Sequence, residues 1–210
     1  MYDKLMRLPF LGWVLFVATV QVAGLSRHTA TVDLNYLFYV AMRLSTVAFM
    51  LLAASAVILR SAPSGKASGL EPRISALLGT FLIYAIVLLP RRDLSLTEEV
   101  VSTLFTMIGN VGAVIALAQL GRSFSIMAES RRLVTTGPYR FVRHPLYAAE
   151  EIATIGMFMQ FALPWAALLF VVQVAFQLRR MHNEELVLTA RFPEYDVYSQ
   201  TTARLIPGIY

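Results

Sequence analysis

The chain has no cysteine among its 210 residues. This absence excludes disulfide bonds, a catalytic thiolate and every metal site that needs a cysteine ligand. Charged residues are scarce too, at 15% of the chain, whereas a soluble domain normally carries about a quarter. Hydrophobic residues make up 57%. Such a composition is typical of an integral membrane protein.

Long apolar runs predict where the chain crosses the membrane. Six stretches approach the roughly 20 residues that a helix needs to span the hydrocarbon core. They cover residues 8–25, 34–59, 74–90, 100–120, 145–161 and 164–181. We therefore expect an all-α bundle of about six transmembrane helices. A short link ending in Pro164 predicts that the last two form a tight hairpin, and the Pro-, Ser- and Gly-rich segment 61–72 is expected to be a loop.

The distribution of basic residues predicts the orientation of the bundle. If the N-terminus is cytoplasmic, most of the 18 Lys and Arg residues fall in cytoplasmic segments, as the positive-inside rule requires. The exceptions are Arg27, Arg91 and Arg92 in external loops and Arg43 within the second span. We expect a multi-pass protein with both termini in the cytoplasm.

The two halves of the chain differ in character. Residues 1–120 are mostly lipid-compatible and predict a scaffold of about four helices. Residues 121–210 concentrate the Arg, His, Glu and Tyr side chains. We expect this second region to carry the chemistry, with its polar residues at the cytoplasmic end.

The most informative stretch is residues 137–147. It opens with a Gly-Pro turn, and Pro145 suits the first position of a helix, so His144 would cap that helix. The first N–H groups and the positive end of the helix dipole would then lie near Arg140 and Arg143. That arrangement suits a carboxylate or another anion. The alternative is that these arginines only contact lipid headgroups.

An acidic pair, Glu184 and Glu185, follows the last predicted span. Carboxylates beside an apolar span are costly and gather where cations or substrates bind, so this pair could hold an ammonium or lie near a sulfonium. The alternative is an ordinary i, i+4 salt bridge such as Arg180 with Glu184. His182 and Glu185 have i, i+3 spacing, but one such pair is a weak signal, and we expect no metal ion.

A second acidic pair, Glu150 and Glu151, lies less than two turns into the fifth span. At that depth both carboxylates need partners, for which Arg140, Arg143 and Arg43 are candidates. Alternatively, the helix begins outside the bilayer and both carboxylates are solvated. The polar, aromatic-rich tail 192–207 predicts an amphipathic lid on the cytoplasmic face, or else a simple interfacial anchor.

Five blocks in the second region resemble the isoprenylcysteine carboxyl methyltransferase family, within the wider group that includes phospholipid N-methyltransferases. They are Leu-Val-Thr-Thr-Gly-Pro-Tyr-Arg at 133–140, Arg-His-Pro-Leu-Tyr at 143–147, Glu-Glu at 184–185, Glu-Tyr-Asp-Val-Tyr at 194–198 and Ile-Pro at 206–207. The resemblance covers roughly residues 117–210. One departure is Ala149, where the family often has glycine, followed here by Glu150 and Glu151.

The resemblance implies an S-adenosylmethionine-dependent methyltransferase whose cofactor pocket faces the cytosol, between the last hairpin and the polar tail. The cofactor-site residues that it implies are Tyr139, Arg140, Arg143, His144, Tyr147, Glu184 and Glu185. Arg204, in the tail, is the candidate to meet an acidic substrate. We expect a lipophilic small molecule or a lipid-modified substrate taken from the membrane lipid, and no nucleic acid.

Methyl transfer from a sulfonium needs alignment and a desolvated nucleophile, with no metal or covalent intermediate. A carboxylate nucleophile needs only a cation such as Arg204 to orient it. An amine nucleophile must lose a proton, for which Glu150, Glu151 or His144 would be the base. The candidate catalytic residues are therefore Arg204, Glu150 and Glu151.

Three other functions compete with methylation of a lipophilic carboxylate. The nearest is a lipid amine N-methyltransferase, which the sequence scarcely distinguishes. Another is a steroid-reductase-like enzyme with a nicotinamide cofactor, although no dinucleotide fingerprint is present. The last is a transporter or a non-catalytic lipid-binding protein. Transport is disfavoured because the polar residues cluster at one end and do not line a path through the bilayer midplane.

Overall fold

The structure, a computed structural model, describes residues 7–26 and 34–208 and is mostly helical. Its α-helices are α2 (Arg7–Ser26), α3 (Leu34–Leu59), α4 (Glu71–Phe81), α5 (Leu96–Leu120), α6 (Pro145–Phe158), α7 (Trp165–Arg191) and α8 (Tyr195–Thr201). Three 3-10 segments are η1 (Leu82–Leu88), η2 (Gly121–Ser123) and η3 (Gly137–Arg140). Two short strands, β1 (Gly65–Lys66) and β2 (Glu129–Ser130), pair antiparallel.

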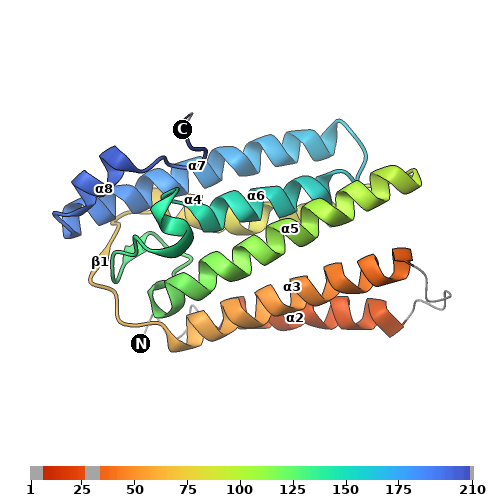
Figure 1. Ribbon diagram of the computed structural model, residues 1–210, viewed down its shortest axis with the longest axis horizontal. Coiled ribbons are helices and arrows are strands. Elements are labelled where there is room, and N and C mark those ends of the chain that lie inside the picture. Colours follow the sequence, from red (N-terminus) through yellow and green to blue (C-terminus); the bar gives the residue numbers. More distant parts are fainter. Residues whose placement is uncertain (1–6, 27–33, 209–210) are drawn as a thin grey trace.

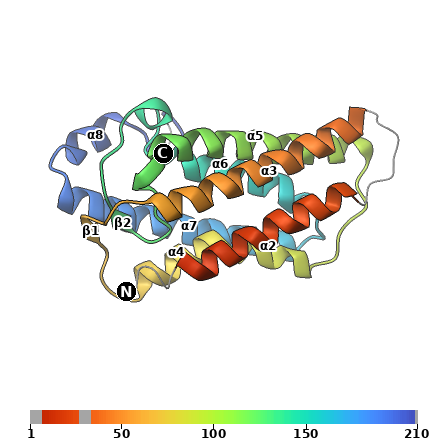
Figure 2. The same cartoon turned by 90° about the horizontal axis from the view of Figure 1, so that it is seen from below.

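The long helices lie side by side along the long axis of the molecule (Figure 1). In that view α2 and α3 form one side and α7 the other, with α5 and α6 between them. The strands and α8 gather at one end, as the view from below also shows (Figure 2). We call this end, which carries β1, β2, η3 and α8, the polar end.

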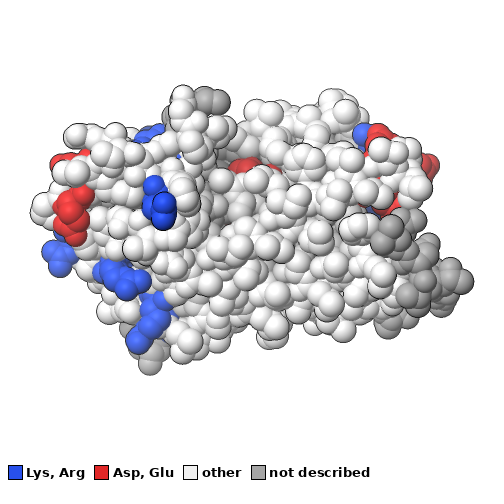
Figure 3. Space-filling view, viewed as in Figure 1, with Lys and Arg blue, Asp and Glu red and all other residues white. Residues whose placement is uncertain are grey.

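Within the described residues, four helical segments are long and apolar enough to cross a membrane: Arg7–Leu25, Tyr36–Leu59, Glu71–Leu88 and Leu96–Ser123. Charged side chains gather at the two ends of the molecule, and the band between them is almost uncharged on the face shown in Figure 3. These features confirm the predicted class, a mostly helical protein with several membrane-spanning helices. Because α6 has only 14 residues, it is about 21 Å long and falls short of the 30 Å hydrocarbon core.

Several element bounds differ from the prediction. The third helix begins earlier, at Glu71, with a proline in its first turn, and its second part tightens into η1. The last long helix continues well past residue 181 to Arg191, because its polar residues there face partners inside the protein. The segment 61–72, predicted as a loop, contains β1, which pairs with β2 far along the chain.

Small residues let α5 and α6 approach closely. A Cβ at Gly109 of α5 would overlap the backbone of Ala149 and Ala153, and one at Gly156 of α6 would overlap the backbone of α5. The Ser102 hydroxyl donates to the Gly156 carbonyl at 2.7 Å. Such contacts between small residues are a common way to pack membrane helices, and here they fix α6 against α5.

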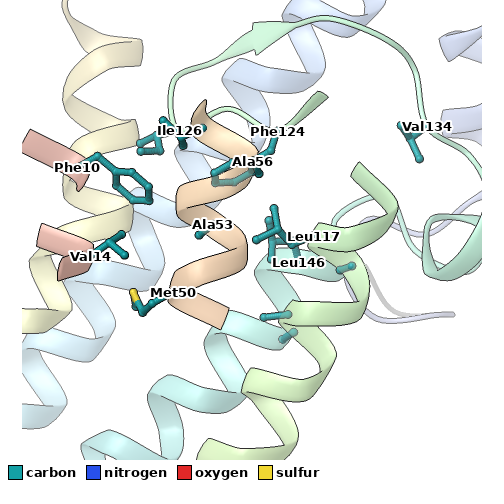
Figure 4. Close-up of a cluster of buried hydrophobic side chains, with 14 of the residues drawn as sticks. Phe10, Val14, Met50, Ala53, Ala56, Leu117, Phe124, Ile126, Val134 and Leu146 are labelled. Carbon is teal, nitrogen blue, oxygen red and sulfur yellow. The ribbon is translucent and has the colours of Figure 1, made fainter. Parts of the chain in front are cut away.

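A cluster of buried apolar side chains joins α2, α3, α5 and the start of α6 to the segment 124–134 (Figure 4). The members labelled there are Phe10, Val14, Met50, Ala53, Ala56, Leu117, Phe124, Ile126, Val134 and Leu146. Tyr139 also belongs to this cluster. The loops of the polar end therefore rest on the helical scaffold.

The packing of α6 and α7 differs from a simple hairpin. Most backbone contacts of α6 are with α5, and α7 packs more closely on α4 than on any other single element. The link between them, residues 159–164, is tied to the loop before α5, since the Ala162 N–H donates to the Pro90 carbonyl at 2.9 Å. Polar side chains fill the seam between α6 and α7, which we call the α6–α7 seam and define by Glu150, Glu151, Gln173 and Gln177.

We expect Gly109→Ala to destabilise the protein by about 1–3 kcal/mol, because its methyl group must push α6 away from α5. For a domain of this size, that loss lowers Tm by roughly 2–4 °C per kcal/mol. Gly12→Ala is the matched control, since a Cβ there meets nothing within 4 Å. Thermal unfolding in detergent measures both; equal Tm values for the two variants would contradict the packing described.

Candidate functional site

The C-terminal tail runs alongside the residues that precede α6. The Arg143 N–H donates to the Ala203 carbonyl at 2.8 Å, and the His144 N–H donates to the Arg204 carbonyl at 3.1 Å. Val142 and Ala203 form an isolated parallel bridge. The backbone of the tail is thereby placed over the start of α6, at the polar end.

The carboxylate of Glu185 lies at the centre of this end. Its Oε1 accepts from Arg143 Nε at 3.0 Å and from Arg204 Nε at 3.1 Å, and it lies 3.1 Å from His144 Nε2. Its Oε2 accepts from Arg204 Nη2. One carboxylate on α7 therefore holds the start of α6 and the tail together.

Arg143 also secures α8. Its Nη1 donates to the Ser199 carbonyl and, at 3.0 Å, to the Thr202 carbonyl. The Tyr198 hydroxyl of α8 donates to the Tyr139 carbonyl at 2.5 Å. These contacts close the tail over the segment that runs from η3 to α6.

His144 is the residue before α6, but its side chain does not cap the helix as expected. Its side chain makes no hydrogen bond to the first turn of the helix. The ring instead contacts Glu185 and stacks on Tyr147, with 5.4 Å between the ring centroids. Pro145 does take the first helical position as predicted.

Tyr147, Glu184 and Arg180 form a second group beside the Glu185 cluster. The Tyr147 hydroxyl donates to Glu184, and Arg180 Nε lies 3.5 Å from Glu184 Oε1, the predicted i, i+4 pair. The Arg180 guanidinium lies 4.6 Å from the centroid of the Tyr147 ring. Arg180 is fully buried, and its Nη1 donates to Thr80 of α4 at 2.9 Å.

The adjacent carboxyl groups of Glu184 and Glu185 have opposite pKa shifts. Burial tends to raise the pKa of Glu185, but hydrogen bonds from His144 and Arg204 and the charge of Arg143 lower it to about 2. Burial raises the pKa of Glu184, and Arg180 only partly offsets the effect. Such divergent pairs are common at functional sites, because each environment sets a different protonation state.

A cavity of about 100 Å³ lies between these elements. Its lining includes Tyr139, Arg143, His144, Tyr147, Glu184, Tyr195 and Tyr198, together with residues of the segment 123–134. Three atoms of lining residues, the Tyr139 and Tyr195 hydroxyls and Arg131 Nη1, are buried without a hydrogen-bond partner among the described residues. Buried polar groups normally have partners, so these three are available to a ligand.

The structure brings most of the sequence-predicted site residues together. Those that meet in or beside the cavity are Tyr139, Arg143, His144, Tyr147, Glu184, Glu185 and Arg204. Arg140 lies apart: its side chain is exposed, and its guanidinium lies 4.6 Å from the ring centroid of Phe141. Its neighbour in the helical turn, Tyr139, points inward instead.

Glu150 and Glu151 have different partners from those expected. Neither pairs with Arg140, Arg143 or Arg43 in the described part of the chain. Gln177 Nε2 donates to Glu150 and Gln173 Nε2 donates to Glu151, each at 3.0 Å. The cation whose charge reaches Glu150 is Arg180.

Sequence reasoning missed the roles of Gln173 and Gln177, and it considered Arg180 only as a salt-bridge partner. A signal was present, because residues 173, 177, 180 and 184 follow the i, i+4, i+7, i+11 spacing of one helix face. That face carries polar side chains along α7 and contacts both α6 and α4.

A second, much larger cavity of about 1530 Å³ lies among α2, α3, α4, η1 and α5. Its wall is mainly apolar and aromatic, with Trp13, Phe16, Phe81 and Tyr84 among its residues. Glu129, of β2, lines both cavities. The segment 126–129 thus separates the large apolar cavity from the small polar one.

Residues 101–190 match the isoprenylcysteine carboxyl methyltransferase (ICMT) family. They include most of α5, the segment between α5 and α6, all of α6 and nearly all of α7. This similarity is carried by less than half of the chain. The match confirms the resemblance for the three blocks at 133–140, 143–147 and 184–185. It begins earlier than expected and ends before the tail, so the blocks at 194–198 and 206–207 lie outside it.

Three curated relatives illustrate the range of the similarity. The nickel-cobalt-cadmium resistance protein NccN of Alcaligenes xylosoxydans xylosoxydans is 30% identical over 114 residues, which are 52% of this chain and 53% of that protein. The protein-S-isoprenylcysteine O-methyltransferase of Schizosaccharomyces pombe is 36% identical over 100 residues (45% and 42%). Protein-S-isoprenylcysteine O-methyltransferase A of Arabidopsis thaliana is 31% identical over 110 residues (49% and 56%). The chain spans about half the length of these relatives.

Among the described residues, no three His, Asp or Glu side chains gather in a group that could hold a metal ion. The nearest clusters at the polar end are instead ion pairs, since Arg143 and Arg204 surround Glu185. The side chains that a ligand would meet at the polar end are charged and aromatic.

We expect the Glu185 contacts to make the stability of the folded protein depend on pH. Because the pKa of Glu185 is lowered to about 2 in the folded protein, its stabilisation is complete above the ordinary value of about 4.5 and is lost as pH falls from there toward 2. Thermal unfolding of wild type and Glu185→Gln, measured between pH 7 and pH 3, tests this. The two Tm values should converge on acidification, and a constant difference would contradict the assignment.

Proposed function

We propose that this protein transfers the methyl group of S-adenosylmethionine to the carboxylate of a lipophilic substrate at the membrane surface. The observation that carries the proposal is the juxtaposition of two cavities. The small one is lined by Tyr139, His144, Tyr147 and Glu184 within the family-matching region, and the large apolar one meets it at Glu129.

The residues of the small cavity suit the chemical groups of this cofactor. A carboxylate (Glu184) and the faces of aromatic rings (Tyr139, Tyr147) are the environment that sulfonium and ammonium groups prefer. The unpartnered Tyr139 hydroxyl and Arg131 Nη1 are suited to its hydroxyl and carboxylate groups. When bound, the cofactor supplies an electrophilic methyl carbon.

Binding requires the polar end to open. The cavity of about 100 Å³ is smaller than the roughly 300–1,000 Å³ of pockets that hold ligands of this size. The elements that cover it are α8 and the tail, held by Arg143 and by the Arg204–Glu185 pair. We propose that these two attachments loosen to admit the cofactor and re-form to exclude water.

The large cavity supports a lipophilic substrate. Its apolar wall suits a hydrocarbon chain, and basic side chains (Lys66, Arg60 and Arg73) line its end nearest the small cavity. A substrate whose chain lies in the membrane would then present a carboxylate at the polar end. An ionised carboxylate needs no base, so the protein has only to orient and desolvate it.

In this scheme Arg204 and Arg143 place positive charge beside the cavity and orient the carboxylate. Glu150 and Glu151 lie beyond Tyr147 along α6 and are not needed as bases for ester formation; they would serve only an amine substrate. The remaining topology is also proposed. The passes are α2, α3, α4 with η1, α5, α7, and α6 extended by the link 159–164, because α6 alone is too short to cross. The polar end faces the cytosol.

Calorimetry with S-adenosylhomocysteine tests the cofactor site. We expect Glu184→Ala and His144→Ala to weaken binding by about 10- to 100-fold, the cost of losing a hydrogen bond to a charged group. Glu99→Ala is the control, because Glu99 is an exposed carboxylate on α5 at the opposite end of the molecule. No binding to well-folded wild type at millimolar cofactor would exclude the methyltransferase.

A second measurement distinguishes the product. With labelled S-adenosylmethionine and a membrane extract, a methyl ester releases volatile methanol on treatment with base, whereas an N-methyl product does not. We expect base-labile label. If the label is stable to base and is lost in Glu150→Gln, the methyl acceptor is an amine and not a carboxylate.

A further inference from the structure

The α6–α7 seam holds two carboxyl groups that the proposed reaction does not use. They lie opposite two glutamines, one turn apart, near the middle of α7. Figure 3 shows an acidic patch in the otherwise uncharged middle band, over the place where Figure 1 draws α6 beside α7. The acidic residues of α6 are Glu150 and Glu151.

Three oxygen atoms of this seam lack partners. Glu151 Oε2, Gln173 Oε1 and Gln177 Oε1 are buried and accept no hydrogen bond from the described residues. Both glutamines are almost completely buried, with 2% and 1% of their surface exposed. All three atoms are acceptors, so what the seam lacks is a donor or a cation.

The same side chains are already oriented by their other atoms. Gln173 Nε2 donates to Glu151 Oε1 and to the Gly79 carbonyl, and Gln177 Nε2 donates to Glu150 Oε2. An amide oxygen lies about 2.3 Å from its own nitrogen. Each unpartnered amide oxygen is therefore held close to the carboxylate that its nitrogen contacts.

Gly79 of α4 provides the space at this point. A Cβ there would come within 2.9 Å of Gln177 Oε1 and 3.3 Å of the Gln177 backbone. The glycine lets α4 approach α7 and leaves room beside α4 for the Gln177 oxygen. Three helices thus converge on a small region that is rich in oxygen.

The charge of the region is also unbalanced. Among the described residues, the charge of Arg180 acts on Glu150 and Glu184, and its Nε lies 3.5 Å from Glu184 Oε1. Glu151 has the neutral Gln173 as its hydrogen-bond partner. One additional proton could form a hydrogen bond with only one of the two amide oxygens. A cation can accept several oxygen ligands at once, and carboxylate and amide oxygens are the ligands that hard cations prefer.

We propose that the α6–α7 seam binds one small hard cation through the side-chain oxygens of Glu150, Glu151, Gln173 and Gln177. This departs from the expectation of no metal, which considered His and carboxylate ligands but not the glutamines. The site is separate from the cofactor cavity and does not depend on methyl transfer. Bound there, the cation joins α6 to α7 at mid-membrane depth.

Thermal unfolding of the purified full-length chain in detergent tests the site. Sodium, magnesium, calcium or manganese chloride is added at constant ionic strength, balanced with choline chloride. At 100-fold excess over Kd, we expect one of these cations to raise Tm by about 5–10 °C. Glu151→Gln, which keeps the shape of the side chain, should abolish the rise, and the exposed-site control Glu194→Gln should retain it.

Two outcomes would overturn the proposal. If no cation raises Tm and acidification alone does so in wild type, the carboxyl groups carry protons in place of a cation. If Glu151→Gln retains the rise, the cation binds elsewhere. Should that variant fail to fold, equilibrium dialysis of the wild type with the same four chlorides decides: one saturable cation per chain is expected, and no saturable binding rejects the site.

Discussion

The carboxylate of Glu185 is the interaction on which the polar end depends. It contacts Arg143 and His144, which precede α6, and Arg204 in the tail. Removing one partner of a buried charge cluster leaves the others uncompensated, which is far more costly than the net value of any single pair. The position of the tail, and with it the cover of the small cavity, therefore follows from one side chain on α7.

That arrangement requires a rigid support. The helix α6 is fixed along its length because Gly109 and Gly156 allow α5 and α6 to pack with almost no side chain between them. On the other side, Arg180 ties α7 to α4 through Thr80 and reaches the Ser125 carbonyl at 3.4 Å. The site thus rests on helices of the scaffold, while its cover is a short segment held by a few charged contacts.

Local sequence patterns were sufficient to predict several parts of the structure. Apolar runs identified the long helices because a membrane helix must be apolar over its length. Pro145 marked the first residue of α6, since proline suits that position. The clustering of His144, Tyr147, Glu184 and Glu185 followed from their resemblance to a family, and the structure places them within contact of one another.

Other features depend on contacts between distant residues. Arg140 and Arg143 are three residues apart, yet Arg140 is exposed and Arg143 is largely covered by the tail, because the chain bends between the end of η3 and the start of α6. The pairing of β1 with β2 and of Val142 with Ala203 has no local signal. The partners of Glu150 and Glu151 were missed because glutamine carries no charge that would attract attention in a sequence.

Hydrogen–deuterium exchange with and without the Glu185→Gln substitution tests most directly whether Glu185 holds the tail. In the wild type, the Arg143 and His144 amides are bonded to the tail and α8 is anchored, so their exchange should be slow. We predict that Glu185→Gln accelerates exchange at Arg143, His144 and residues 195–204, while the middle of α5 and α6 keeps its protection. Unchanged protection of the tail in this variant would contradict the account.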